Sequence, residues 1–268
     1  TYRITPLSIW NATASGVTPQ MMLEALEGYA KYPVPDNVLV DVRELAGRWG
    51  RLKLLEAGSQ LALEVAPSDK ALLLELRRNK RLQVLLGEAL AVGVPLLNRG
   101  TVKQTLLELG YPVEDLAGFT EGVEFNVPLS SRTVVRDYQL EAANVFYQAG
   151  AKTGGSGVIV LPPGSGKTMV GIQVMSLINQ RTLILTTNRT SVQQWRREIL
   201  EKTRLEPDDV VEYGADRKQI AAVTICTYQM LTHRKGSKAA RGDEGAALEY
   251  PHMELFKSSE WGLIVYDE

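Results

Sequence analysis

The chain has 268 residues, of which 30 are lysine or arginine and 31 are aspartate or glutamate, so its formal net charge is -1. The hydrophobic fraction of 44% excludes an intrinsically disordered chain. The longest nearly apolar stretch, residues 82–97, is interrupted by Gln83 and Glu88 and is shorter than the ~20 residues that span a bilayer. A single cysteine, Cys226, and two histidines exclude a disulfide framework and argue against a zinc site built by the protein.

The first part of the chain, residues 1–127, is predicted to be a small α+β region. Thr18 is a suitable N-cap and Pro19 a suitable first residue for one helix. The apolar residues that follow are interpreted as core rather than as a site. The other elements expected here are a helix over residues 36–49, a hairpin of residues 51–56 and 59–65 that turns at 57–58, a short helix capped by Ser68, and a helix that begins at the capping-box pair Thr101 and Gln104 and ends at Gly110.

A polar connection around Pro128 predicts a domain boundary between residues 127 and 128. Beyond it, short apolar runs without alternation are typical of a parallel sheet that is covered on both faces. The alternation of such runs with helical stretches predicts a doubly wound α/β domain with a parallel sheet over residues 128–268. The expected strands are residues 157–161, 182–185, 222–227 and 262–266, the expected helices are 169–179 and 191–202, and residues 232–245 are expected to form a flexible loop.

Both ends of the chain indicate a piece of a longer protein. The chain begins with Thr1 rather than Met, and no basic-then-apolar signal segment follows. It stops at an apolar strand that runs into two carboxylates, an arrangement normally found in the middle of a domain. We therefore expect a fragment that ends inside its second domain.

The segment Leu161 to Thr168, of sequence LPPGSGKT, is a candidate phosphate-binding loop before a helix. Gly164 and Gly166 allow consecutive backbone N–H groups to turn toward a phosphate, and the helix N-terminus adds partial positive charge. Lys167 would reach the β- and γ-phosphates of ATP, and the Thr168 hydroxyl would bind Mg²⁺. Leu161 stands where the strict pattern has glycine, and the structural alternative is a glycine-containing turn followed by a surface lysine. The residues assigned to the nucleotide here are Pro163, Gly164, Ser165, Gly166, Lys167 and Thr168.

Two acidic residues end the last predicted strand. Asp267 could hold the water shell of Mg²⁺ opposite the P-loop hydroxyl, and Glu268 could orient or deprotonate an attacking water. Such a pair favours an ATPase over a nucleotide kinase, because a kinase needs no group that activates water. The candidate catalytic residues are thus Lys167, Asp267 and Glu268, and the candidate metal ligands are Thr168 and Asp267.

Polar residues also flank the loop on both sides. Asp137 is expected to cap a helix that carries Gln139, whose amide offers a donor and an acceptor to an adenine edge, although an exposed helical glutamine is the simpler interpretation. After the loop, Ser191 and Gln194 have capping-box spacing. Trp195 is expected to fill the core rather than to stack on a base.

Five segments in this order resemble the motifs of superfamily 2 helicases of the XPB family, the 3′-to-5′ DNA helicases and translocases of nucleotide excision repair. The resemblance covers about half of the chain, and Leu161 is usual in that family. The segments are RDYQ at residues 136–139, SGVIVLPPGSGKT at 156–168, VQQW at 192–195, TYQML at 227–231 and EWGLIVYDE at 260–268.

The resemblance implies that residues 128–268 are a RecA-like P-loop helicase domain, and it implies roles for particular residues. Arg136 and Gln139 would bind ATP beside the phosphate loop, and Asn188, Gln194 and Thr227 would lie near single-stranded or forked DNA. The first 127 residues resemble the N-terminal domain of bacterial XPB proteins more weakly, with residues 96–127 in the place of a damage-recognition domain and a repair nuclease or other repair protein as partner. The implied location is the cytoplasm and nucleoid, or the nucleus of a eukaryote.

Two other functions stay open on the sequence. One is a different superfamily 2 translocase, such as a chromatin-remodeler-type motor or a restriction motor subunit. The other is a module that binds a partner protein through residues 1–127 while its motor half is inert. The balanced charge leaves any nucleic-acid binding to local groups, and DNA is preferred to RNA on the resemblance alone.

Overall fold

A computed structural model of the chain describes residues 3–67, 69–86, 94–215, 217–233 and 250–267. It divides into two compact units, unit 1 (Thr1–Gly118) and unit 2 (Phe119–Glu268). The domain boundary predicted at residues 127 and 128 stays a prediction. Within the described residues, no helix combines the length and the apolar character that crossing a membrane requires.

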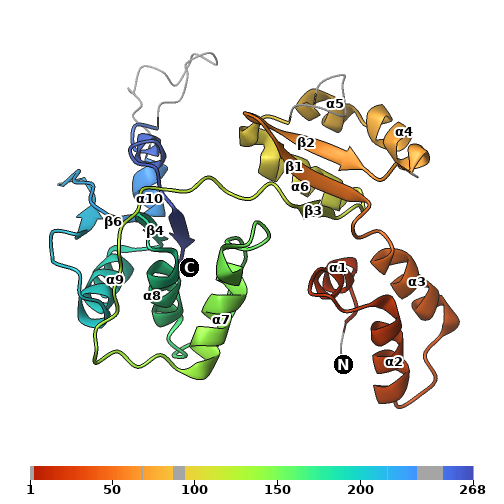
Figure 1. The fold of residues 1–268 in the computed structure, drawn as a ribbon, viewed down its shortest axis with the longest axis horizontal. Helices are drawn as coiled ribbons and strands as arrows, with labels where there is room; N and C mark the ends of the chain where they lie inside the picture. The colour runs from red at the N-terminus through yellow and green to blue at the C-terminus, as the bar shows by residue number, and fades with distance from the viewer. Residues whose placement is uncertain (1–2, 68, 87–93, 216, 234–249, 268) are drawn as a thin grey trace. The chain divides into compact units, whose positions relative to one another are not determined.

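The N-terminal part of unit 1 is a group of three helices with a small apolar core. Thr18 caps α2 by accepting a hydrogen bond from the Met21 N–H, with Pro19 in the first turn as predicted. The Trp10 indole donates to the Leu45 carbonyl at 2.8 Å and ties the first helix to the third. The helices are α1 (Pro6–Ala14), α2 (Pro19–Tyr29) and α3 (Asp36–Ala46), and their shared core is Ile9, Leu23, Val42 and Ala46 (Figure 1).

The rest of unit 1 is a three-stranded sheet in the order β2-β1-β3, with helices packed on it. β1 and β2 pair antiparallel as the predicted hairpin, and β3 adds to β1 in parallel. The core between sheet and helices includes Leu52, Leu54, Leu72 and Leu106, all at most 2% exposed. The elements are β1 (Leu52–Ala57), β2 (Gln60–Val65), α4 (Lys70–Arg78), α5 (Lys80–Leu86), η1 (Leu96–Asn98), α6 (Arg99–Glu108) and β3 (Val113–Asp115).

Three local predictions in unit 1 were wrong or lie outside the described residues. Ala57 pairs with Gln60, so the hairpin turns at residues 58–59 instead of 57–58. The expected capping box at Thr101 fails because the preceding turn η1 runs directly into α6, which starts at Arg99. Ser68 lies outside the described residues, and Asp69 caps α4 by accepting from the Leu72 N–H.

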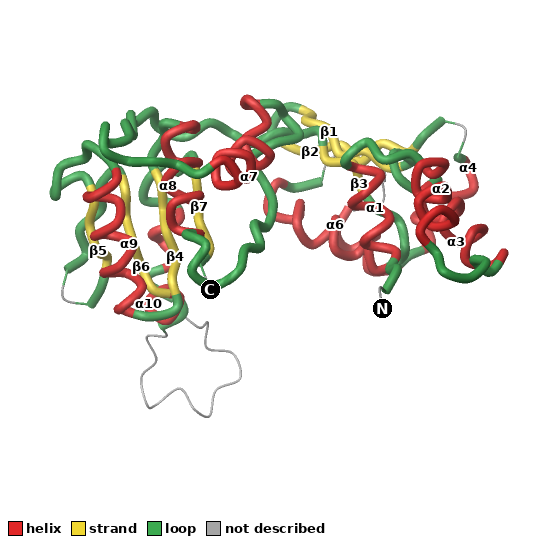
Figure 2. The backbone as a smooth tube through the Cα atoms, turned by 90° about the horizontal axis from the view of Figure 1, so that it is seen from below, coloured by secondary structure: helices red, strands yellow, loops and turns green. Residues whose placement is uncertain are grey.

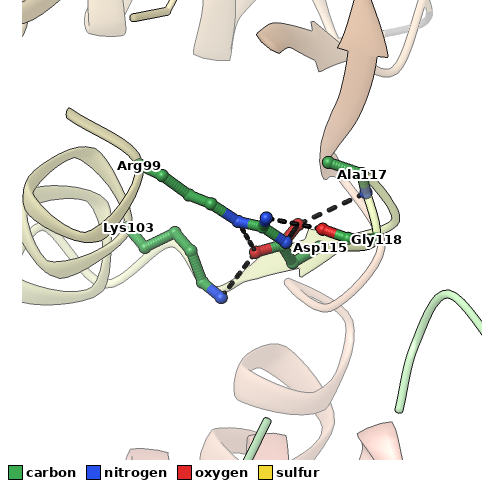
Figure 3. Close-up of polar contacts among 5 residues, drawn as sticks. All are labelled: Arg99, Lys103, Asp115, Ala117 and Gly118. Carbon is green, nitrogen blue, oxygen red and sulfur yellow. Dashed lines mark hydrogen bonds and ion pairs between the residues drawn. The ribbon is translucent and has the colours of Figure 1, made fainter. Parts of the chain in front are cut away.

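A cluster of charged side chains lies around Asp115, the last residue of β3 (Figure 3). Arg99 donates to both carboxylate oxygens of Asp115, at 3.0 and 2.8 Å, and also to the Gly118 carbonyl at 2.6 Å. Lys103 adds a third donor to Asp115 at 2.7 Å. Burial disfavours the ionised carboxyl, but the hydrogen bonds from Arg99 and Lys103 outweigh it and hold the pKa of Asp115 below its ordinary value.

Unit 2 is an α/β domain built on a parallel sheet in the order β5-β6-β4-β7. Helices α8 and α9 lie over one face of the sheet, and α7 packs against α8 (Figures 1 and 2). The predicted fold class, a P-loop α/β domain preceded by a smaller α+β region, is therefore confirmed. The elements are α7 (Asp137–Tyr147), η2 (Gln148–Gly150), α8 (Lys167–Ile178), β4 (Thr182–Thr186), α9 (Arg189–Lys202), β5 (Val210–Tyr213), β6 (Val223–Thr227), α10 (Tyr228–Leu231), η4 (Met253–Phe256) and β7 (Leu263–Tyr266).

Alternate residues of the central strand β4 face different cores. Ile184 packs toward α8 and α9, in the core that also holds Trp195 and Ile199. Leu183 and Leu185 point to the other face, where α10 and η4 cover the sheet. All five residues of β4 are buried, as expected for a strand inside a parallel sheet covered on both faces.

The strand expected at residues 157–161 is absent from the described structure. This segment forms no ladder with β7, and Val158 and Val160 are 89% and 85% exposed. Its apolar residues predicted burial, but within the described residues no neighbouring strand holds the segment. β5 was not predicted, because residues 210–213 contain only two apolar residues before Glu212 and Tyr213.

Residues that precede α7 bond to the body of unit 2. The Val123 N–H donates to the Glu260 carbonyl, and the Phe125 N–H donates to the Asn179 carbonyl, both at 2.9 Å. Gly122 is required at the closest point, because a Cβ there would lie 2.1 Å from the backbone nitrogen of Gly262. These bonds explain why unit 2 begins at Phe119, before the polar connection at Pro128.

Candidate functional site

The candidate phosphate loop is a tight, exposed turn that leads into α8. Ser165 donates through its N–H and its hydroxyl to the Pro162 carbonyl, at 3.2 and 2.7 Å. Gly164 and Gly166 have φ of +77° and +81°, values that strongly favour glycine. Gly166 is the N-cap of α8, so Lys167 and Thr168 are its first two residues, where backbone N–H groups lack partners inside the helix. The loop therefore has the backbone of an anion site.

Lys167 and Pro163 are exposed on this turn. The Lys167 ammonium donates to the Leu161 carbonyl at 3.4 Å, so the side chain folds back over the loop. It is predicted to bind the phosphates of a nucleotide held by this loop. Thr168 is partly buried behind it. Within the described residues a single long hydrogen bond holds this ammonium, so little opposes its movement toward a ligand.

Gln139 connects α7 to the loop. It is only 4% exposed, its Oε1 accepts from the Arg136 N–H at 3.1 Å, and its Nε2 donates to the Ser165 carbonyl at 3.0 Å. Tyr138 donates to the same carbonyl at 2.5 Å. The expected cap at Asp137 was wrong by one residue, because Arg136 is the N-cap and Asp137 the first helical residue. Contact of Gln139 with adenine stays a prediction, since its amide is bonded to the loop here.

An open pocket of about 540 Å³ lies beside the loop. Arg136, Gln139 and the loop residues Gly164, Ser165 and Gly166 are among its lining residues, so five predicted site residues meet there. Pro163, Lys167, Thr168 and Asp267 are outside its lining. The other lining residues are Ser130, Arg132, Thr133, Val134, Met169, Glu198, Glu201 and Lys202.

The sequence analysis did not predict that residues 130–134 and the end of α9 line this pocket. Lys202, at the end of α9, accepts through its carbonyl from the Ser130 N–H at 2.8 Å and from the Thr133 hydroxyl at 2.7 Å. These bonds bring residues 130–134 against the end of α9. They join residues about 70 positions apart, so no local pattern could reveal them.

Asp267 follows the last residue of β7, and its N–H donates to the Leu185 carbonyl at 2.9 Å. Its Oδ2 accepts from the indole Nε1–H of Trp195 at 2.8 Å. Trp195 is 3% exposed and belongs to the core between the sheet and α8, so its expected place in the core is confirmed. Its bond to Asp267 was not predicted. Glu268 lies outside the described residues.

Two of the candidate DNA residues, Thr227 and Asn188, lie at or just after the ends of adjacent strands. Thr227 pairs in register with Thr186 at the last position of β6 and β4, and Asn188 follows two residues later. Asn188 caps α9 by accepting from the Ser191 N–H at 2.9 Å, so the helix starts at Arg189 and the expected box of Ser191 and Gln194 was wrong.

Thr227 similarly caps α10, by accepting from the Met230 N–H at 3.3 Å. Gln194 is exposed on α9 and donates to Glu198 at 2.8 Å. Contact of these residues with DNA stays a prediction. The expected loop at 232–245 lies outside the described residues, apart from Thr232 and His233.

A glycine-rich turn at the start of a helix, in a domain with a parallel sheet and an aspartate after one strand, is the arrangement of the P-loop class of α/β domains. Residues 132–268, half of the chain, match the family described as "Type III restriction enzyme, res subunit", and residues 1–91 match "Helicase conserved C-terminal domain". The chain therefore belongs to the res-subunit family, and its whole length aligns with relatives named DNA 3'-5' helicase XPB.

Three relatives illustrate this alignment. The chain is 43% identical over 273 residues to the DNA 3'-5' helicase XPB of Mycobacterium tuberculosis and 42% identical to that of Kineococcus radiotolerans, in each case over 100% of this chain and 46% of the relative. It is 30% identical to the general transcription and DNA repair factor IIH helicase/translocase subunit XPB of Antonospora locustae, over 100% of this chain and 39% of the relative. The chain thus spans about half the length, or less, of these curated relatives.

Proposed function

We propose that the chain is the N-terminal portion and first motor domain of an ATP-dependent 3′-to-5′ DNA helicase or translocase of nucleotide excision repair. The observation that carries the proposal is the exposed glycine-rich loop at the N-terminus of α8, in the same unit as Asp267, which follows the end of β7. The second support is the alignment of the whole chain with relatives named as DNA 3'-5' helicases.

The residues of the loop would bind the phosphates of ATP. Backbone N–H groups at residues 164–168 would hold the oxygens, and the Lys167 ammonium would move from the Leu161 carbonyl to the β- and γ-phosphates. Arg136, Gln139 and the 540 Å³ pocket beside the loop would receive the base and ribose. Pro163 and Ser165 would shape the turn.

Thr168 and Asp267 would hold Mg²⁺, which neutralises phosphate charge when bound. The donor set fits this ion, because Mg²⁺ prefers a hydroxyl, a carboxylate and water as oxygen ligands. Asp267 also uses only one carboxylate oxygen within the described residues. Glu268 would orient the attacking water and accept its proton.

DNA would bind at the edge of the sheet where Asn188 and Thr227 lie, near Gln194. Hydroxyl and amide groups there would contact the phosphate backbone, which positions a strand without reading its sequence. Unit 1 would bind a repair nuclease or another repair protein. The protein would act in the cytoplasm on nucleoid DNA, or in the nucleus of a eukaryote.

Hydrolysis and unwinding by the full-length protein test the proposal. Phosphate release and displacement of a strand from a duplex with a 3′ tail are measured with wild type, Lys167→Ala and Glu268→Gln. Lys218→Ala serves as the matched control, because Lys218 is also an exposed lysine of unit 2. We expect Lys167→Ala to reduce hydrolysis to background, Glu268→Gln to bind ATP without hydrolysing it, and Lys218→Ala to match wild type. A wild-type protein without ATPase activity, or an active Lys167→Ala, would refute the proposal.

A further inference from the structure

We propose that Trp195 is a positioning residue for Asp267, holding its carboxylate in the orientation that binds the water shell of Mg²⁺. The inference rests on the proposed function, because it assigns a task to the carboxylate that the nucleotide site would use. Trp195 touches no substrate in this scheme. It acts through the single hydrogen bond from its indole N–H to Asp267 Oδ2, at 2.8 Å.

The hydrogen bond fixes one oxygen and leaves the other open. Asp267 is placed by its backbone, which extends the ladder between β7 and β4 through the Leu185 carbonyl. Its side chain could still rotate, and the indole removes this freedom by taking Oδ2. Within the described part of the chain no other hydrogen bond reaches this carboxylate, so Oδ1 stays available to a cation or its water.

The donor is neutral, and this matters for a group that must attract a cation. Asp115 in unit 1 shows the opposite arrangement, since both of its oxygens are bonded to the cations Arg99 and Lys103 (Figure 3). That carboxylate is charge-compensated and serves structure. An indole N–H can orient Asp267 equally well while leaving its negative charge uncompensated.

The indole itself is held rigidly against the helix that carries the phosphate loop. A Cβ on Gly171 would lie 2.6 Å from Trp195 Cη2 and 3.2 Å from Cζ3, so the ring packs directly on the backbone of α8. Gly171 is four residues, about 6 Å of helix, after Lys167. Trp195 therefore contacts α8 about one turn after Lys167 and bonds to Asp267, so it links the helix that follows the phosphate loop to this carboxylate.

A purely structural role would not require this acceptor. Two other indoles donate to backbone carbonyls, the buried Trp10 to Leu45 at 2.8 Å and the partly buried Trp261 to Leu255 at 2.9 Å. Trp10 is 4% exposed, so its burial and its bond length match those of Trp195. Trp10→Phe is thus the control for the loss of a buried indole hydrogen bond away from the nucleotide site.

The test measures the Mg²⁺ concentration that half-saturates binding of a fluorescent, non-hydrolysable ATP analogue to the full-length protein. We expect Trp195→Phe, which keeps an aromatic ring but removes the donor, to raise this concentration by about tenfold, in line with the loss of other groups that orient metal ligands. Trp10→Phe is expected to match wild type. Asp267→Asn is expected to raise the concentration further, because it removes the charge.

The outcomes separate the inference from the proposed function. If Asp267→Asn weakens Mg²⁺-dependent binding and Trp195→Phe does not, the positioning role is overturned and the nucleotide site stands. If Asp267→Asn has no effect, the proposed site itself fails.

Nitrogen-15 labelling of the tryptophan indoles gives a second measurement, which does not need the Trp195→Phe variant. It tests the inference even when that variant does not fold. One indole resonance should move in Asp267→Asn, and the same one should move on saturation with Mg²⁺ and the analogue. If no indole resonance moves in either case, the inference is overturned.

Discussion

Replacing Gly171 by alanine tests the packing of Trp195 on α8. The new methyl carbon would lie 2.6 Å from Trp195 Cη2, whereas carbon atoms pack best at ~3.5–4.0 Å. The ring cannot swing away freely, because its other end is bonded to Asp267. Overpacking of this kind costs ~1–3 kcal/mol, and the better helix propensity of alanine returns only about 1 kcal/mol. We expect a net loss of up to about 2 kcal/mol in the free energy of unfolding.

Urea denaturation of Gly171→Ala, Trp195→Phe and the double variant measures this effect. Phenylalanine lacks the outer part of the indole, so the double variant should recover the cost of the methyl group, with a coupling of about 1 kcal/mol or more. Gly28→Ala is the control, because Gly28 lies in α2 and its added methyl would meet nothing within 4 Å. It should be stabilised slightly. Additivity of the two changes in unit 2 within ~0.5 kcal/mol would refute the packing argument.

Three further predictions concern single groups. Because the pKa of Asp115 is lowered, its ion pairs stabilise unit 1 fully above the ordinary carboxyl pKa of 3.8, and this stabilisation is lost as the pH falls through the lower pKa of the folded state. Thermal melts at a series of pH values should show this loss. If Asp115→Asn keeps the same acid dependence of stability as wild type, the prediction is contradicted. Burial raises the pKa of Cys226 to about 11, so a thiol reagent at pH 8 should modify it only after unfolding, and rapid reaction of the native protein would contradict its burial. Asn188→Ala should cost ~1 kcal/mol by removing the cap of α9, while Asn188→Asp should keep it; equal stability of the two variants by urea denaturation would rule out the cap.

Local rules predicted the elements that local chemistry specifies. Thr18 and Pro19 start α2 because an N-cap hydroxyl and a fixed proline φ act within one turn. Leu183 and its neighbours in β4 are buried on both faces, as their unbroken apolar run indicates. Gly164 and Gly166 take the positive φ that the loop motif requires.

The remaining features depend on contacts between distant residues. The hydrogen bond from Trp195 to Asp267 joins residues 72 positions apart, and no local sequence pattern around either residue indicates it. The cap at Thr101 was a valid local pattern, but the helical turn before it was continuous with α6. The prediction of a strand at residues 157–161 was wrong because a strand needs a hydrogen-bonded neighbour as well as apolar residues.

A crystal structure of the full-length protein with Mg²⁺ and a non-hydrolysable ATP analogue tests the central claim most directly. The account predicts phosphates against residues 164–168, a metal between Thr168 and Asp267, and the indole of Trp195 still bonded to Asp267. Nucleotide bound away from the loop, or a metal bound without Asp267, would contradict it.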